Sequence, residues 1–170
     1  KKWKLNKSSK KEFRSVLHGT LVQEKDNKII DENNFKIVTN LYPDRKQIKD
    51  LIFAWNVVKL VKSNAIVIVK DMMTIGIGSG QPSRVDSSKM AIKKALNLVN
   101  KNIDSRISLN KSVMASDAFF PFPDGITEAI ERGICSIIQP GGSLRDNQVI
   151  DLANKKEISM VFTGIRSFKH

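Results

Sequence analysis

The sequence predicts a single domain of the α/β class covering residues 1–170, and two patterns carry that prediction. Residues 124–163 alternate helix, strand, helix and strand, which is typical of a right-handed parallel unit. An apolar, β-branched run at 65–69 predicts a buried strand, and an extended run at 74–78 predicts its hairpin partner. A chain of 170 residues, 41% of them hydrophobic, suits one domain with its own core.

The N-terminal part begins with a polar, basic lead-in, which we place at about residues 1–12. Short extended segments are expected at 20–23 and 35–38. The first strong helix begins at Pro43-Asp44, because a proline in the first turn lacks an N–H that would have no partner there. This helix is supported by an apolar stripe at helical spacing, which consists of Ile48, Leu51, Ile52, Trp55 and Val58.

The remaining elements follow the same periodicities. Helices are expected at 86–100, 125–132 and 146–155, and strands at 134–138 and 159–162. Residues 101–111 are expected to be irregular. The single cysteine, Cys135, lies in an apolar run and is predicted to be a buried core residue. One cysteine allows no internal disulfide, which fits a reducing cytoplasm.

Composition and charge limit the class of function. The net charge of +12 leaves three interpretations, namely nucleic-acid binding, a lysine-rich surface, or a site for anionic small molecules. The sequence contains no nucleic-acid motif and no basic helical stripe interleaved with aromatic residues, so no nucleic-acid partner is expected. It contains no run of about 18 apolar residues, so no membrane partner is expected. The chain begins with Lys1 rather than Met, which favours a piece of a longer protein.

The loop at 78–84 has the features of an anion site. Gly78 and Gly80 leave room for a ligand close to the backbone. Ser83 can cap the helix that follows, and Arg84 can bind an anion at that helix N-terminus. The Gly-Lys-Ser/Thr ending of a P-loop is missing. A plain turn with a helix cap explains the same residues, and the sequence leaves both interpretations open.

The segment at 116–124 is the most unusual part of the chain. It contains three phenylalanines, two prolines and two aspartates. Aromatic rings stiffened by prolines make a good wall for a flat heterocycle, and the acidic groups could bind ring nitrogens. The alternative is a core-filling strand, with Asp124 capping the next helix.

Other polar positions are less specific. Asn64 precedes the strand at 65–69, where its amide could face a ligand or cap a helix. The turn at 139–143 joins a strand to a helix, a usual place for ligands in α/β sheets, although it could equally be structural. His18 and His170 lie in no catalytic motif, and with one cysteine they give no zinc-ligand pattern.

Five segments together resemble one known family. They occur in the same order in AICAR transformylase, and they are residues 62–67, 76–85, 116–124, 138–143 and 161–170. The resemblance covers about residues 13–170 and matches the C-terminal half of that family's transformylase region. It implies a cytidine-deaminase-like three-layer α/β/α fold with a mixed sheet. The deaminase zinc signature is missing, so no metal site is implied.

The resemblance also implies roles for individual residues. Asn64 is similar to a catalytic asparagine that holds the formyl oxygen. The residues implied for AICAR binding are Gln81, Ser83, Arg84, Arg166 and His170. The residues implied for the folate pocket are Phe119, Phe122 and Asp124, and the cosubstrate is 10-formyltetrahydrofolate.

The implied reaction is formyl transfer from 10-formyltetrahydrofolate to the 5-amino group of AICAR, giving FAICAR in purine (IMP) biosynthesis. The family's proton-transferring Lys-His pair belongs to the N-terminal half of the transformylase, which this chain lacks, so activity of the chain alone is not expected. A homodimer, cytoplasmic location and an IMP cyclohydrolase in the same longer protein are also implied. The alternative is a non-catalytic nucleotide- or folate-binding or assembly module.

Overall fold

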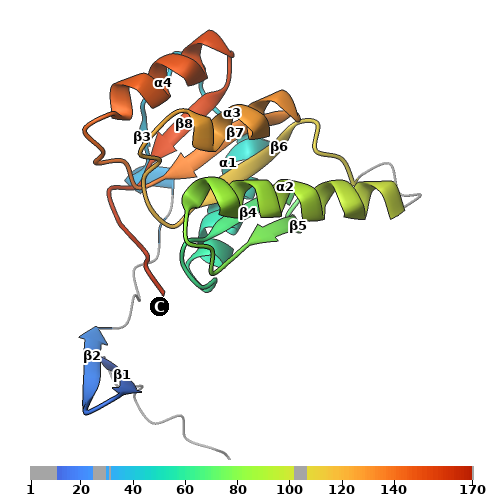
Figure 1. Cartoon of the computed structure of the whole chain (residues 1–170). Helices are drawn as coiled ribbons and strands as arrows, with labels where there is room; N and C mark the ends of the chain where they lie inside the picture. The colour runs from blue at the N-terminus through green and yellow to red at the C-terminus, as the bar shows by residue number, and fades with distance from the viewer. Residues whose placement is uncertain (1–10, 25–29, 31, 102–106, 170) are drawn as a thin grey trace, which may run out of the picture.

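The structure is a computed structural model that describes residues 11–24, 30, 32–101 and 107–169. A six-stranded mixed sheet forms its centre, with the strand order β3-β8-β7-β6-β4-β5 (Figure 1). The described elements are β1 (Lys11–Val16), β2 (Gly19–Glu24), the 3-10 helix η1 (Glu32–Asn34), β3 (Lys36–Ile37), α1 (Arg45–Val58), β4 (Ile66–Lys70), β5 (Met73–Gly78), α2 (Arg84–Lys101), β6 (Ser112–Ser116), α3 (Asp124–Glu131), β7 (Ile134–Gln139), α4 (Asp146–Lys155) and β8 (Ser159–Phe162).

Helices cover both faces of the six-stranded sheet, so the predicted three-layer α/β/α architecture with a mixed sheet is confirmed. Helix α1 packs on one face against β4, β6 and β7, while α2, α3 and α4 pack on the other. Strand β4 contributes to both cores, because successive side chains of a strand point to opposite faces. Ile66 and Ile68 belong to the core under α2 and α3, and Val67 and Val69 belong to the core under α1.

Strand directions follow the predicted pairing. β4 and β5 form the expected antiparallel hairpin, and β7 and β8 form the expected parallel unit. Strand β6 lies between them, parallel to β7 and antiparallel to β4. It was not predicted as an element of its own, because buried serines at both ends, Ser112 and Ser116, hide its apolar character in the sequence.

Local sequence signals define the helix starts. At α1, the Asp44 carboxylate accepts from the N–H groups of Lys46 and Gln47, and the Gln47 side chain accepts from the Asp44 N–H, which completes a capping box. Helix α2 begins at Arg84, two residues before the expected start. Ser83 fixes that start, since its Oγ accepts from the N–H of Asp86 at 3.0 Å.

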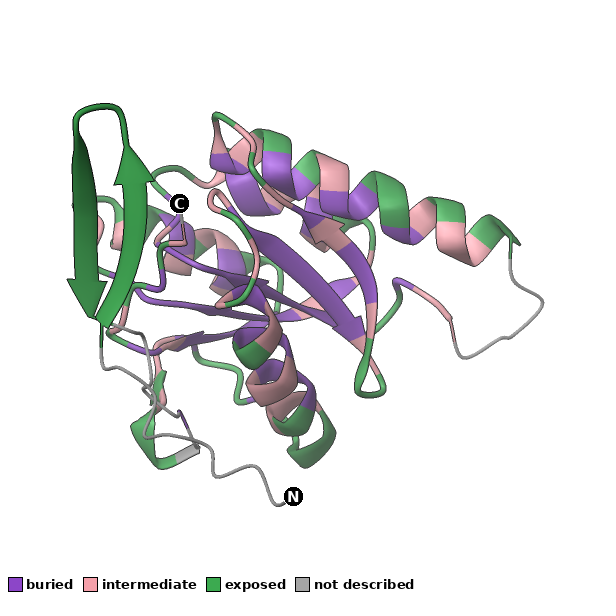
Figure 2. Cartoon of the chain, turned by 90° about the horizontal axis from the view of Figure 1, so that it is seen from below, coloured by how far each residue is buried: buried purple, intermediate pink, exposed green. Residues whose placement is uncertain are grey.

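The N-terminal region differs from its prediction in one respect. Residues 11–16, for which no regular element is predicted, form β1, which pairs with β2 in a separate antiparallel hairpin. Every residue of both strands is exposed, as Figure 2 shows. Lys11 and Glu12, which we placed in the lead-in, therefore belong to a strand. Residues 1–10 lie outside the described part of the chain.

Cys135 is half-buried rather than part of the core, which corrects the sequence prediction. Its Sγ lies 3.2 Å from Nε2 of Gln47 on α1, at the start of β7. Partial burial raises the pKa of the thiol, which keeps it protonated and unreactive.

Glycines in β5 allow a helix to pack very closely. A Cβ built on Gly76 would lie 2.3 Å from the Ala91 carbonyl oxygen, and one on Gly78 would lie 1.8 Å from the Ser87 carbonyl oxygen. The space at Gly78, which the sequence left open for a ligand, is therefore filled by the backbone of α2. No helix in the described residues is long and apolar enough to cross a membrane.

The β4–β5 turn depends on one buried carboxylate. Asp71 and Met72 both have positive φ, 51° and 60°, as a two-residue hairpin turn of type I′ requires. Asp50 on α1 accepts from both of their N–H groups, at 3.0 and 2.7 Å. Lys46, also on α1, forms an ion pair with Asp71 at 2.5 Å, which raises the lysine pKa. Helix α1 thus holds the turn in its strained conformation.

Replacing Asp50 by Ala is expected to lower the free energy of unfolding by about 2 kcal/mol, since two backbone donors lose a charged acceptor. Urea unfolding followed by circular dichroism measures the effect. Asp151→Ala, at an exposed position of α4, is the matched control and should change stability by less than about 0.5 kcal/mol. Equal losses for the two variants would show that the turn does not depend on Asp50.

Candidate ligand site

One cleft lies at the edge of the sheet where several strands end. Strands β6, β7 and β8 run parallel and β4 runs antiparallel to β6, so the ends of three strands and the start of β4 share that edge. Ligands of α/β sheets usually bind outside the carboxyl ends of the parallel strands, and β6, β7 and β8 all end at this edge. The cleft measures about 300 Å³, and its lining residues are Asn64, Pro82, Ser83, Arg84, Ala118, Phe119, Pro121, Arg166 and Phe168.

The floor of the cleft is a buried ion pair between Arg84 and Asp117. Asp117 follows β6 and is completely buried, while Arg84 at the start of α2 is 8% exposed. One guanidinium nitrogen of Arg84 binds both the Asp117 carboxylate and the Ser116 Oγ. The positive charge of Arg84 is therefore neutralised within the protein, and this arginine is less available to a ligand anion than the sequence suggested.

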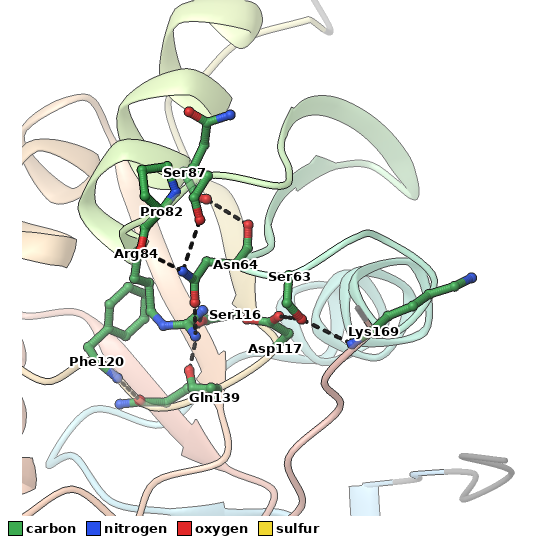
Figure 3. Close-up of polar contacts among 12 residues, drawn as sticks. Ser63, Asn64, Pro82, Arg84, Ser87, Ser116, Asp117, Phe120, Gln139 and Lys169 are labelled. Atoms are coloured by element: carbon green, nitrogen blue, oxygen red, sulfur yellow. Dashed lines mark hydrogen bonds and ion pairs between the residues drawn. The ribbon is translucent and has the colours of Figure 1, made fainter. Parts of the chain in front are cut away.

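Asn64 is held by the same network, as Figure 3 shows. Its Oδ1 accepts from the other guanidinium nitrogen of Arg84 at 3.0 Å. Its Nδ2 donates to the carbonyl oxygens of Gln81 at 3.0 Å and Pro82 at 3.2 Å. Ser87 on α2 donates to the Asn64 carbonyl oxygen at 2.6 Å. The amide of Asn64 thus ties the loop before α2 to the start of β4 and fixes Arg84 from a second side.

Asp117 also anchors the C-terminal segment. Its second carboxylate oxygen accepts from Ser63 Oγ at 2.5 Å, and its carbonyl oxygen accepts from the Ser167 N–H at 3.0 Å. Ser63 Oγ in turn accepts from the N–H of Lys169 at 3.0 Å (Figure 3). These contacts hold the segment after β8 against the sheet edge. They position Arg166, while His170 lies outside the described residues.

Phe119 and Arg166 form the open side of the cleft. The Arg166 guanidinium carbon lies 4.8 Å from the centroid of the Phe119 ring, a cation–π distance. Phe119 lies in the loop after β6, which is held by a hydrogen bond from the Phe120 N–H to Oε1 of buried Gln139 at 2.9 Å. Arg166 is exposed and forms no ion pair with any described carboxylate. Its charge is therefore open to a ligand.

The predicted site residues divide into two groups. Those that the cleft brings together are Asn64, Ser83, Arg84, Phe119 and Arg166. Gln81 approaches the cleft through its backbone carbonyl, while its side chain donates to the Ser79 carbonyl oxygen at 3.1 Å. Phe122 and Asp124 are exposed and lie outside the lining. Asp124 is the first residue of α3, and Pro123 before it occupies the N-cap position, so Asp124 is not the residue that caps this helix.

Sequence reasoning gave no specific role to the polar residues beneath the cleft. Asp117 and Ser116 were noted only as part of an unusual segment, and Ser63 and Gln139 only as parts of polar turns. A signal does exist in the sequence, because these polar residues directly flank apolar strands, where burial requires partners. Which partners they find depends on the strand pairing, which the sequence alone did not supply.

The chemistry available to the cleft is binding and orientation. Among its lining residues the ionisable side chains are Arg84 and Arg166, and arginine does not give up its proton in proteins. A proton acceptor for catalysis must therefore come from outside this lining. In the described part of the chain no group of three His, Cys, Asp or Glu side chains could hold a metal ion.

Comparison with known proteins places the chain in a family. Residues 1–94 match the family model described as the AICARFT/IMPCHase bienzyme. The chain is 52% identical to the bifunctional purine biosynthesis protein PurH of Chlorobium chlorochromatii and 54% identical to that of Caldicellulosiruptor saccharolyticus. Each match spans 159 residues, which is 94% of this chain and 29% of the relative. The chain therefore spans less than a third of the length of these curated relatives.

Proposed function

Because the chain belongs to the AICARFT/IMPCHase bienzyme family, we propose that it is the C-terminal half of the transformylase region and acts in formyl transfer from 10-formyltetrahydrofolate to AICAR. The observation that carries the proposal is the single cleft shared by Asn64, Arg84, Phe119 and Arg166. An aromatic wall suits the flat pterin of a folate, and an uncompensated arginine suits the phosphate of AICAR. The names of the relatives support a place in purine biosynthesis.

Within this proposal the two arginines of the cleft have different tasks. Arg166 binds the nucleotide anion, and Arg84 positions Asn64 and the loop before α2. Asn64 stabilises the oxyanion that develops on the formyl group by donating from Nδ2. The 3.2 Å bond from Nδ2 to the Pro82 carbonyl is the longer of its two and is the one that a formyl oxygen would replace.

The proton-transferring groups, and the residues that complete the site, belong to other parts of the assembly. We place them in the N-terminal half of the transformylase, with residues 1–170 forming one domain of a cytoplasmic, homodimeric protein that also carries IMP cyclohydrolase. The exposed β1–β2 hairpin supports a larger assembly, since an isolated two-stranded hairpin is marginally stable in water. Within this proposal, Gln81, Ser83 and His170 line the nucleotide site, and Phe122 and Asp124 line the folate pocket.

A second candidate function is a binding module without chemistry. The observation that favours it is the lack of a proton acceptor among the residues that line the cleft. The two candidates differ in one measurable property, which is turnover in the presence of the missing half.

Tetrahydrofolate release by the purified chain, with saturating AICAR and 10-formyltetrahydrofolate, tests the proposal. We expect no turnover by the chain alone, and turnover after addition of the part of the Caldicellulosiruptor relative that this chain does not match. Asn64→Ala should then lower the rate on the order of 100-fold, as loss of an oxyanion donor does, whereas exposed Asn147→Ala should not.

Calorimetric binding of AICAR and folate separates the remaining outcomes. Turnover by the chain alone would show that the proton-transferring group lies within it. Binding without turnover in the mixture would support the module. Absence of both would contradict any role of the cleft in this reaction.

A further inference from the structure

A second arginine–phenylalanine pair lies next to the cleft, and its arginine, Arg145, has no role in the function proposed so far. Arg145 immediately precedes α4, and its guanidinium carbon lies 4.2 Å from the centroid of the Phe122 ring. Phe122 is three residues beyond Phe119 in the same loop, and Pro121 between them lines the cleft. The pair thus extends the cleft rim from the loop after β6 to the loop after β7.

Arg145 differs from Arg84 in that no carboxylate of the described residues neutralises its charge. Arg84 is buried against a carboxylate, whereas Arg145 is exposed and forms no ion pair with any described carboxylate. A guanidinium stacked on a ring keeps its N–H groups directed outward in its own plane, where they can bind a carboxylate in a bidentate manner. The stack restricts the side chain without neutralising it. Arg145 is therefore a preorganised cation.

The backbone around Arg145 is also fixed. The Arg145 N–H donates to Ser143 Oγ at 3.1 Å, and the Gly142 N–H donates to the Asp146 carboxylate at 2.7 Å. Gly141 packs on the Phe162 ring, where an added Cβ would lie 2.3 Å from a ring carbon. The prolines that flank Phe122 stiffen the opposite loop. Arg145 and Phe122 are therefore each held in place by features of their own loops.

We propose that Arg145, held over Phe122, binds the glutamate carboxylates of the folate cosubstrate. The proposal rests on the proposed function. A folate has a flat ring system at one end and one or more glutamates at the other. If the rings pack on Phe119, the carboxylates lie beyond them along the rim, where Phe122 and Arg145 are found. The AICAR phosphate is the other available anion, and Arg166 within the cleft lining is the arginine that meets it.

Calorimetry with three ligands tests the proposal: pteroate carries no glutamate, folate carries one and folate triglutamate carries three. The ligands are titrated into the wild-type chain and into Arg145→Ala, each mixed with the part of the Caldicellulosiruptor relative that this chain does not match. Wild-type affinity should rise with the number of glutamates. Arg145→Ala should weaken triglutamate binding about tenfold, as loss of one charge-assisted contact does, and leave pteroate and AICAR binding unchanged. The gain in wild-type affinity that each glutamate gives should decrease as the salt concentration rises.

Arg132→Ala is the matched control, because Arg132 is also exposed but precedes β7, at the opposite end of that strand. It should bind all three compounds like the wild type. Equal weakening of pteroate and triglutamate binding by Arg145→Ala would overturn the proposal in favour of a structural role. Weaker AICAR binding would overturn it in favour of a phosphate contact. If the wild-type chain mixed with the missing half binds neither pteroate nor AICAR, the proposed function itself fails.

Discussion

Replacing Asp117 by Ala is expected to lower the free energy of unfolding by about 3–5 kcal/mol. The substitution leaves the Arg84 guanidinium buried without its counter-ion, and the desolvation of that charge is then uncompensated. It also removes the acceptor of Ser63 Oγ. Chemical unfolding followed by circular dichroism measures the change, and Asp124→Ala, at an exposed carboxylate of α3, should change stability far less.

A double variant separates the ion pair from simple packing. Arg84→Met combined with Asp117→Leu removes both charges and keeps side chains of comparable size, so its stability should lie closer to wild type than that of Asp117→Ala. The two single substitutions should therefore be strongly non-additive. Additive losses would contradict the view that the pair acts as a unit.

The ion pair also changes how the site is understood. From sequence, Arg84 was one candidate anion ligand, because it follows a glycine-containing loop at a helix start. In the structure its charge is satisfied by Asp117, and Arg166 and Arg145 are the cations left open at the rim. Arg84 therefore acts through the groups that it positions, chiefly Asn64. Arg166 and Arg145 are the arginines that we propose as the contacts for negatively charged groups of a ligand.

The sequence predicted best those helices and strands that have a clear apolar periodicity. Helix α4 and strand β8 were predicted with the bounds observed, because each has a clear apolar repeat ended by turn residues. Strand β1 was missed, since its apolar residues Phe13 and Val16 fall on opposite faces and give no alternation. Central strand β6 was obscured by its terminal serines.

The candidate site was predicted in part for a related reason. Segment resemblance identified Asn64, Phe119 and Arg166, which the cleft brings together. It did not identify Asp117 as the residue that joins them. The contacts of Asp117 reach 33 residues back along the chain to Arg84 and 54 residues back to Ser63. They form because β4 pairs with β6. Interactions of that range are set by tertiary pairing, which local patterns do not encode.

The close contact between β5 and α2 connects stability to the site. Gly78 faces the Ser87 carbonyl, and the Ser87 side chain binds the Asn64 carbonyl. Arg84 lies one helical turn before Ser87. Any displacement of this end of α2 therefore moves Ser87 away from Asn64 and Arg84 away from Asp117 at the same time.

Gly78→Ala is accordingly expected to lower the free energy of unfolding by about 3 kcal/mol and to weaken binding at the cleft. The added Cβ would lie 1.8 Å from the Ser87 carbonyl oxygen and 2.6 Å from its carbon, and backbone atoms cannot yield as a flexible side chain can. Gly19→Ala is the control, since its Cβ would meet only Val16, at 3.8 Å, and it should change stability by less than about 0.5 kcal/mol. Thermal unfolding and AICAR calorimetry on both variants measure the two effects. Loss of stability with unchanged binding would show that α2 can move without disturbing Asn64 and Arg84, which would separate the packing of β5 from the site.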